Sequence, residues 1–198
     1  MSYEFVTSLS LFAFVSSITP GPNNLMLMSS GANYGFKRTI PHLLGVSMGF
    51  VFMAVLLGMG LVNLFEAYPI TYEVLKVTAV VYLFYLAWKI ANASTAQASQ
   101  PTGQPFTFFQ AVLFQWVNPK VWAMALTTIS VYTHDRSMQS VLLVSVIFGA
   151  VNLPCVAVWA TIGQQMAHFL KSPKQLRLFN RIMALLLIAS VYPGIFLN

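Results

Sequence analysis

The chain has 198 residues, of which 58% are hydrophobic and only 7% are charged, with a formal net charge of +6. A soluble domain carries roughly a quarter charged residues, so this chain lacks the polar groups that would cover a surface in water. The basic residues lie in short gaps and form no continuous basic face, which excludes nucleic acid as a partner. We therefore expect an integral membrane protein, with lipid as its solvent.

The apolar residues fall into six runs, and a helix of about 20 residues crosses the hydrocarbon core. The runs are 5–30, 43–62, 70–91, 106–133, 137–167 and 182–197. They predict an all-α protein with six transmembrane helices. The third run is weaker, because Glu73 and Lys76 lie near its start and Lys89 near its end. The alternative is five spans plus one interfacial helix.

A small, polar and uncharged segment, 92–105, divides the chain into halves 1–91 and 106–198. Its composition predicts a flexible linker within one membrane domain. Each half holds three of the expected helices, and three is an odd number. The spacing therefore predicts two inverted three-helix halves, as in inverted-repeat transporters.

The distribution of Lys and Arg predicts how the chain is oriented. Basic residues follow the first, third and fifth runs, namely Lys37, Arg38, Lys89, Lys171, Lys174, Arg177 and Arg181. Only Glu66 and Glu73 follow the second run, and Arg136 lies beside Asp135 after the fourth. These odd gaps should face the cytoplasm, which leaves both termini on the outer side.

The first run is interrupted near its middle by Thr19-Pro20-Gly21-Pro22-Asn23-Asn24. A proline has no N–H to donate to the carbonyl four residues earlier, so the carbonyls of Ser16 and Ile18 lose their helical partners. Two prolines in three residues predict a broken helix. Irregular backbone at membrane depth is tolerated only inside the protein or beside a wet cavity.

Such a break offers both halves of a site for a zwitterion. Freed carbonyls accept hydrogen bonds from an ammonium group, and the N–H groups that open the second half-helix favour a carboxylate. The side chains of Asn23 and Asn24 add donors and acceptors. We expect a substrate site here; the alternative is a packing kink satisfied by neighbouring helices.

The fourth run carries a second interruption, Gln115-Trp116-Val117-Asn118-Pro119-Lys120. Gln115 and Asn118 are three residues apart and share a helix face. Lys120 is the one ionisable residue deep in any run, and no Asp or Glu lies at that depth. A substrate carboxylate would supply its countercharge; the alternative is a lysine bonded to backbone carbonyls for structure.

Two further residues, Asn152 beside Pro154 and His42, are weaker candidates for lining the path of a solute. The sequence has no motif of a hydrolase, a phosphate-binding loop or a metal cluster, so we expect no enzyme, no metal site and no cofactor.

Several segments resemble the amino-acid exporters of the lysine exporter / homoserine-threonine resistance (LysE/RhtB) family. They are the two interruptions, Gly35-Phe36-Lys37-Arg38, and Gly45-Val46-Ser47-Met48-Gly49-Phe50. The resemblance implies a bacterial inner-membrane carrier that expels amino acids, by proton antiport. It implies motif residues at Pro20, Gly21, Pro22, Asn23, Asn118, Pro119 and Lys120. The doubled Asn and the following Ser29-Ser30 are most similar to the branch that exports cysteine and O-acetylserine.

We expect an alternating-access exporter of small neutral amino acids such as threonine, homoserine, cysteine or O-acetylserine, with protons and lipid as partners and a homodimer left open. The substrate site should comprise Pro20, Gly21, Pro22, Asn23, Asn24, Gln115, Asn118, Pro119 and Lys120. The alternatives are another small solute or a metal cation on the same scaffold, and a membrane scaffold protein that transports nothing.

Overall fold

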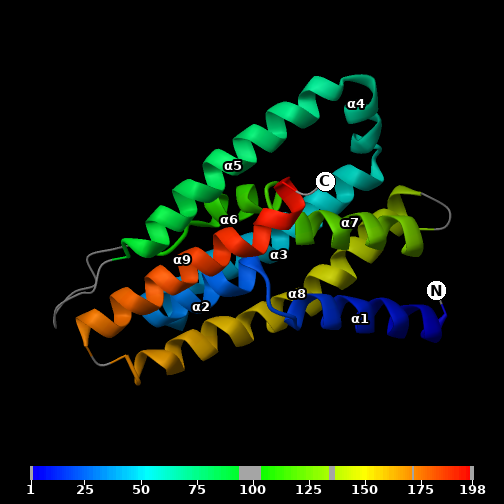
Figure 1. Ribbon diagram of the computed structural model, residues 1–198. Helices are drawn as coiled ribbons and strands as arrows, with labels where there is room; N and C mark the ends of the chain where they lie inside the picture. The colour runs from blue at the N-terminus through cyan, green and yellow to red at the C-terminus, as the bar shows by residue number, and fades with distance from the viewer. Residues whose placement is uncertain (1, 94–103, 134–136, 171, 197–198) are drawn as a thin grey trace.

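The computed structural model describes residues 2–93, 104–133, 137–170 and 172–196, and within them the chain forms helices and no strand. The helices are α1 (Tyr3–Ile18), α2 (Pro22–Tyr34), α3 (Phe36–Gly58), α4 (Leu61–Ala67), α5 (Pro69–Ala91), α6 (Phe108–Gln115), α7 (Pro119–Tyr132), α8 (Met138–Ala167) and α9 (Pro173–Phe196). In Figure 1 the helices α2, α3, α8 and α9 form the body, while α4 and α5 lean away from it.

The helix starts follow from local sequence. Pro22 and Pro119 each occupy the first turn of a helix, where the missing N–H costs nothing. Thr107 caps α6 in a capping box, because its side chain accepts from the Gln110 N–H and the Gln110 side chain accepts from the Thr107 N–H. Both interruptions predicted from the prolines are therefore present as breaks between helices.

Length and composition identify fewer spans than the sequence predicted. Among the described residues, α3, α5 and α8 are each long and apolar enough to cross a membrane, and α1 with α2 makes a fourth if the bent pair is one span. The helix α5 is thus long and apolar enough to be a span. Neither the short α6 and α7 nor the partly basic α9 meets this test, so the six-span arrangement stays a prediction.

Two helices begin earlier in the chain than the apolar runs that predicted them, and so include charged residues. Lys37 and Arg38 lie in the first turn of α3, and the charged residues from Lys174 to Arg181 lie on α9 rather than in a gap. A proline at the start and reciprocal bonds between Ser172 and Gln175 begin α9 early. Hydropathy misses such turns because long basic side chains reach the headgroups from a helix. Asp135, Arg136, Lys171 and most of the predicted linker lie outside the described residues.

The two halves of the chain interlock. The helix α3 packs on α6, while α8 packs on α1 and α2. Glycines permit the closest approaches: a Cβ at Gly31 would lie 2.0 Å from the carbonyl oxygen of Ala160, and one at Gly45 would lie 2.4 Å from that of Phe108. An unbroken helix of each half therefore buries the broken helix of the other.

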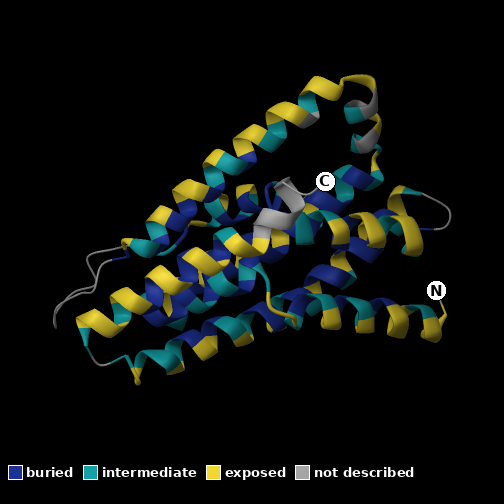
Figure 2. Cartoon of the chain, viewed as in Figure 1, coloured by how far each residue is buried: buried dark blue, intermediate teal, exposed yellow. Residues whose placement is uncertain are grey.

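The outer surface is apolar along most of the molecule. Ile70, Val74, Val77 and Val81 on α5 are each more than half exposed, and Figure 2 shows the exposed residues on the outward sides of α1, α5 and α9. This is the surface that lipid covers.

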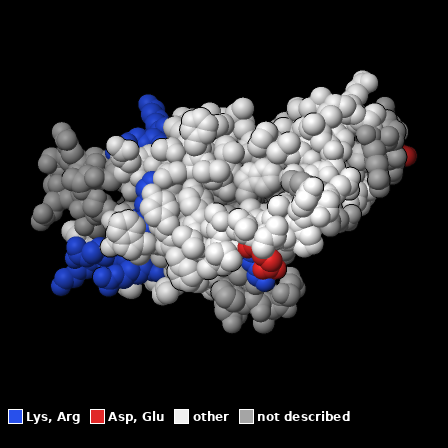
Figure 3. Space-filling view, turned by 90° about the horizontal axis from the view of Figure 1, so that it is seen from above, with Lys and Arg blue, Asp and Glu red and all other residues white. Residues whose placement is uncertain are grey.

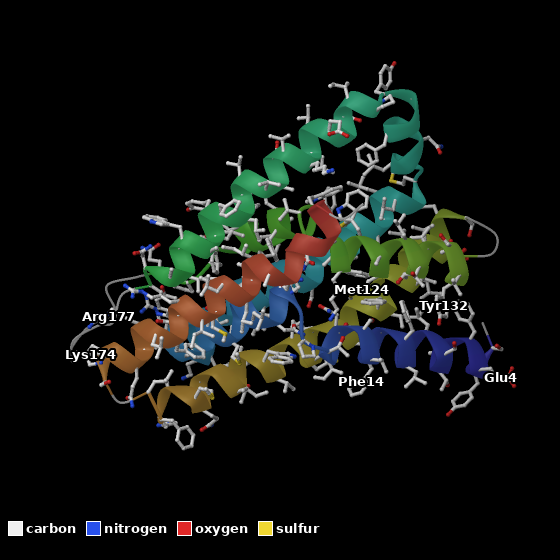
Figure 4. All side chains as sticks on the ribbon, viewed as in Figure 1. Glu4, Phe14, Met124, Tyr132, Lys174 and Arg177 are labelled. Carbon is white, nitrogen blue, oxygen red and sulfur yellow. The ribbon has the colours of Figure 1, made fainter. Side chains whose placement is uncertain are left out.

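The basic residues gather toward one end of the molecule (Figure 3). In Figure 4 the labelled Lys174 and Arg177 lie at that end, and Glu4 at the start of α1 lies at the opposite end. The basic residues that the sequence places after the first, third and fifth runs therefore gather at one end of the fold.

Candidate functional site

The first break separates α1 from α2 between Ile18 and Pro22, and the two helices meet at a bend of 58°. The peptide groups between the two helices lie beside α7 and α8, although Thr19 and Pro20 themselves are exposed. Gly21 has extended backbone there, and it leaves the N-terminus of α2 without a side-chain cap.

The two carbonyls that the prolines free have protein partners. The hydroxyl of Thr19 donates to the carbonyl of Ser16 at 3.0 Å. The indole N–H of Trp159, on α8, donates to the carbonyl of Ile18 at 3.1 Å. Satisfying these groups removes most of the cost of unpaired backbone at membrane depth.

Asn24 stabilises the same break from the other side. Its amide nitrogen donates to the carbonyls of Ser17 at 2.9 Å and Thr19 at 2.8 Å, and the residue is buried. One side chain of α2 thereby ties the start of that helix to the end of α1. Asn24 holds the unwound backbone in place, and its amide donors are already engaged.

The second break separates α6 from α7 between Gln115 and Pro119. Asn118 caps α7, because its side-chain oxygen accepts from the backbone N–H of Lys120 at 3.1 Å. This cap places Lys120 in the first turn of α7, with its side chain directed at the other break.

Lys120 joins the two breaks. Its ammonium nitrogen donates to the carbonyl and the hydroxyl of Thr19, both at 2.8 Å, and to the carbonyl of Pro20 at 3.3 Å. A Cβ at Gly21 would lie 2.8 Å from Cδ of Lys120, so only a glycine leaves room for the lysine to cross. The ammonium therefore occupies the carbonyls of Thr19 and Pro20 in the first break, next to those of Ser16 and Ile18 that the sequence assigned to a substrate.

A reciprocal pair of amides forms a second link between the breaks. Asn23 donates to the side-chain oxygen of Gln115 at 2.8 Å, and Gln115 donates back at 3.3 Å. Gln115 is fully buried, and its nitrogen also donates to the carbonyl of Ala111 at 2.7 Å. The predicted face of polar residues on the fourth run thus meets the first break directly.

A cavity of about 20 Å³ lies between the breaks. Its polar lining comprises Ser16, Ser17, Asn23, Asn24, Gln115, Asn118, Lys120 and Asn152, with Gly21 beside them. Its apolar lining comprises Val46, Phe50, Val121, Met124 and Val156; Met124 is labelled on α7 in Figure 4. Such a volume holds one or two water molecules. It is too small for an amino acid.

Asn152, on α8, is one of the polar residues that line this cavity. Its nitrogen donates to the hydroxyl of Ser17 at 2.9 Å, and its oxygen accepts from the hydroxyl of Ser47 at 2.8 Å. It therefore connects α8 to both α1 and α3 beside the cavity.

The structure does not bring every predicted residue to the cavity. Pro20, Pro22 and Pro119 form the breaks without lining it. His42, expected as a possible residue of the path, does not line this cavity: it is fully buried in α3 against Phe106. Its helix begins earlier than hydropathy indicated, which places His42 inside the protein instead of at a helix end.

Two residues that form hydrogen bonds at the first break were not predicted from the sequence. Thr19 supplies two acceptors to Lys120, and Trp159 supplies the donor for Ile18. The available signal was chemical: a tryptophan inside an apolar run carries an N–H that needs a partner.

Comparison with known proteins gives a consistent result. The family described as LysE type translocator matches residues 14–190. The cysteine/O-acetylserine efflux proteins of Escherichia coli O1:K1 / APEC, O157:H7 and strain K12 are each 26% identical over 190 residues, covering 95% of this chain and 96% of the relative. No solved structure matches the chain.

Proposed function

The chain belongs to the LysE type translocator family, and from this premise we propose that it is a secondary active exporter of small neutral amino acids. The relatives it resembles are named as cysteine/O-acetylserine efflux proteins, so these two compounds head the candidate substrates, with threonine and homoserine after them. Its apolar helices and its family make it a multi-pass membrane protein. We place it in a bacterial inner membrane with the basic end in the cytoplasm.

One observation carries the proposal: the ammonium of Lys120 sits on the carbonyls of Thr19 and Pro20 in the closed site. A substrate ammonium has the same donors and charge as this lysine. When it takes these carbonyls, Lys120 is released to pair with the substrate carboxylate. The exchange leaves no buried charge without a partner, which is the condition for binding a zwitterion at membrane depth.

The open N-terminus of α2 supplies further donors for the carboxylate. Gly21 has no side chain to cap it, and the first N–H groups of a helix have no partners within the helix. The positive end of the helix dipole favours a carboxylate at this position. The apolar wall of Val46, Phe50 and Val156 restricts the substrate to small side chains.

The size of the cavity supports alternating access. Its volume of about 20 Å³ is too small for an amino acid, so the breaks must separate for binding and for release. The link between Asn23 and Gln115 and the bonds of Lys120 both cross this gap. We propose that these contacts open when the substrate enters and that proton antiport drives the cycle.

The test is export from reconstituted vesicles loaded with a panel of amino acids. Lys120→Met should abolish export of cysteine and O-acetylserine, whereas Lys174→Met, at the exposed start of α9, should leave it intact. Undiminished export by a folded Lys120→Met variant would overturn the role of this lysine.

The panel should also include derivatives that lack one charge. An amino-acid methyl ester has no carboxylate, and an N-acetyl amino acid has no ammonium. The exchange of ammonium groups requires both charges, so neither derivative should be exported. Export of either one at the rate of the parent amino acid would contradict the zwitterion site.

A further inference from the structure

A buried histidine lies outside the cavity just described. His42 is 0% exposed, and neither of its ring nitrogens has a hydrogen-bond partner. Burying a polar group without a partner costs free energy that an apolar residue would avoid. Neither the fold nor the substrate site accounts for this imidazole.

The ring of Phe106 contacts both His42 and the ammonium group of Lys89. The centroids of the His42 and Phe106 rings are 5.2 Å apart, in an edge-to-face arrangement. The ammonium of Lys89 lies 4.5 Å from the centroid of the Phe106 ring, a cation–π distance, and it donates to the side-chain oxygen of Gln110 at 3.0 Å. Phe106 is therefore held by one cation and by one group that becomes a cation when protonated.

Phe106 also separates two spaces at the basic end of the molecule. A groove of about 360 Å³ is lined by Lys37, Arg38, Pro41 and the residues from Gln104 to Phe108. A smaller cavity of about 10 Å³ is lined by Ser29, Ser30, Tyr34, Lys89, Ile90, Ala93, Gln104 and Phe106. Because Phe106 lines both spaces and is itself buried, its ring stands at the boundary between the groove and the interior.

Few other titratable groups accompany His42. The elements packed against α3 carry Tyr34 on α2, Lys120 and Tyr132 on α7, Cys155 on α8 and Glu66 on α4, besides Lys37 and Arg38 on α3 itself. The helix α5 contacts Phe106 through Lys89, and its other titratable residues are Tyr72, Glu73, Lys76, Tyr82 and Tyr85. The helix α6 carries none. The carboxylates among these groups are Glu66, on the short helix that follows the far end of α3, and Glu73, near the end of α5 opposite Lys89. Protonation of His42 would thus add a positive charge where the nearby charges are already positive.

We propose that His42 binds the proton exchanged for the amino acid and that Phe106 is the closure this proton operates. The inference rests on the proposed export function. A neutral imidazole packs against Phe106, and the groove is shut from the interior, as the structure has it. Uptake of one proton by the free ring nitrogen gives an imidazolium, which repels Lys89 at the same Phe106 ring and opens the groove of the substrate-free protein; the protein loaded with an amino acid opens without this proton. The same nitrogen then releases its proton to water in the groove.

The cycle that follows is an antiport. A proton that binds His42 while the central site is open outward favours the next opening at the basic end. Loss of that proton and entry of an amino acid favour closure. Proton and substrate then occupy the protein in alternate phases, without a carboxylate in the central site.

The experiment compares two modes of transport in reconstituted vesicles. Export driven by a pH gradient needs the coupled proton, whereas counterflow of labelled against unlabelled cysteine at equal pH does not. His42→Leu should lose pH-driven export and keep counterflow. His168→Leu, which changes an exposed histidine after α8, should keep both. Amino-acid-induced proton flux, read with a dye inside the vesicles, should vanish in the first variant alone.

The folding of the variant is itself a readout. Since His42 makes no hydrogen bond, His42→Leu should unfold at the temperature of the wild type or higher. A lower unfolding temperature would show a structural role and overturn the proposal. Retained pH-driven export, or loss of counterflow in folded protein, would overturn it too. Absence of counterflow in the wild type would instead refute the export function itself.

Discussion

The ammonium of Lys120 lies 2.8 Å from both the hydroxyl and the carbonyl oxygen of Thr19, across 101 residues of chain. Each residue belongs to a different helix break, so this contact joins the two breaks. It converts a pair of local irregularities into one site. Without a bound substrate, the ammonium of the lysine is stabilised by hydrogen bonds to backbone carbonyls and to a hydroxyl.

The hydroxyl of Thr19 should contribute to substrate affinity. Thr19→Val keeps the shape of the side chain and the backbone carbonyl, but it removes one acceptor from the position that we assign to the substrate ammonium. A hydrogen bond to a charged group is worth about 1.5–3 kcal/mol, so the KM of export should rise about ten-fold or more. Thr127→Val, on the exposed side of α7, is the matched control and should change nothing. An unaltered KM in Thr19→Val would remove this residue from the site.

Two glycine-to-alanine changes should separate transport from stability. In Gly21→Ala the new Cβ meets only the flexible side chain of Lys120, at 2.8 Å from Cδ, so the protein should fold while the displaced lysine reduces export. In Gly31→Ala the Cβ meets the backbone oxygen of Ala160 at 2.0 Å. That clash should destabilise the packing of α2 on α8 by about 1–3 kcal/mol. Thermal unfolding in detergent and vesicle export, measured on both variants, check the contrast; equal effects of the two changes on both measurements would refute it.

The amide pair of Asn23 and Gln115 should be energetically coupled. A double-mutant cycle with Asn23→Ala and Gln115→Ala should give a coupling energy of about 0.6 kcal/mol in unfolding, the average for hydrogen bonds between membrane helices. The partly buried pair of Asn33 and Asn180, with reciprocal bonds of 2.7 and 2.8 Å, is the control. Its cycle should show similar coupling without a change in transport kinetics, whereas the first pair should alter both. Additive effects at Asn23 and Gln115 would show that the pair does not link the breaks.

Prediction from sequence succeeded where the cause is local. A proline removes a hydrogen-bond donor from its own helix whatever surrounds it. The breaks at Pro20, Pro22 and Pro119 could therefore be predicted from the sequence, and the structure contains them. The apolar helices were readable too, because lipid imposes a length and a composition on each span. The ends of the helices were harder to predict. The charged turns at the start of α3 and α9 remain helical, because only the ends of their side chains need to reach water.

What the sequence by itself determined is therefore the class of protein, the position of its two breaks and the residue types beside them. Only the tertiary structure decided which group meets which. In the folded protein Trp159 donates a hydrogen bond to the carbonyl of Ile18, and Lys120 donates one to the carbonyl of Thr19. The ring of His42 is buried without a hydrogen-bond partner. The physical reason is range: a hydrogen bond is made over about 3 Å, and its partner in a folded chain is set by the packing of helices distant in sequence.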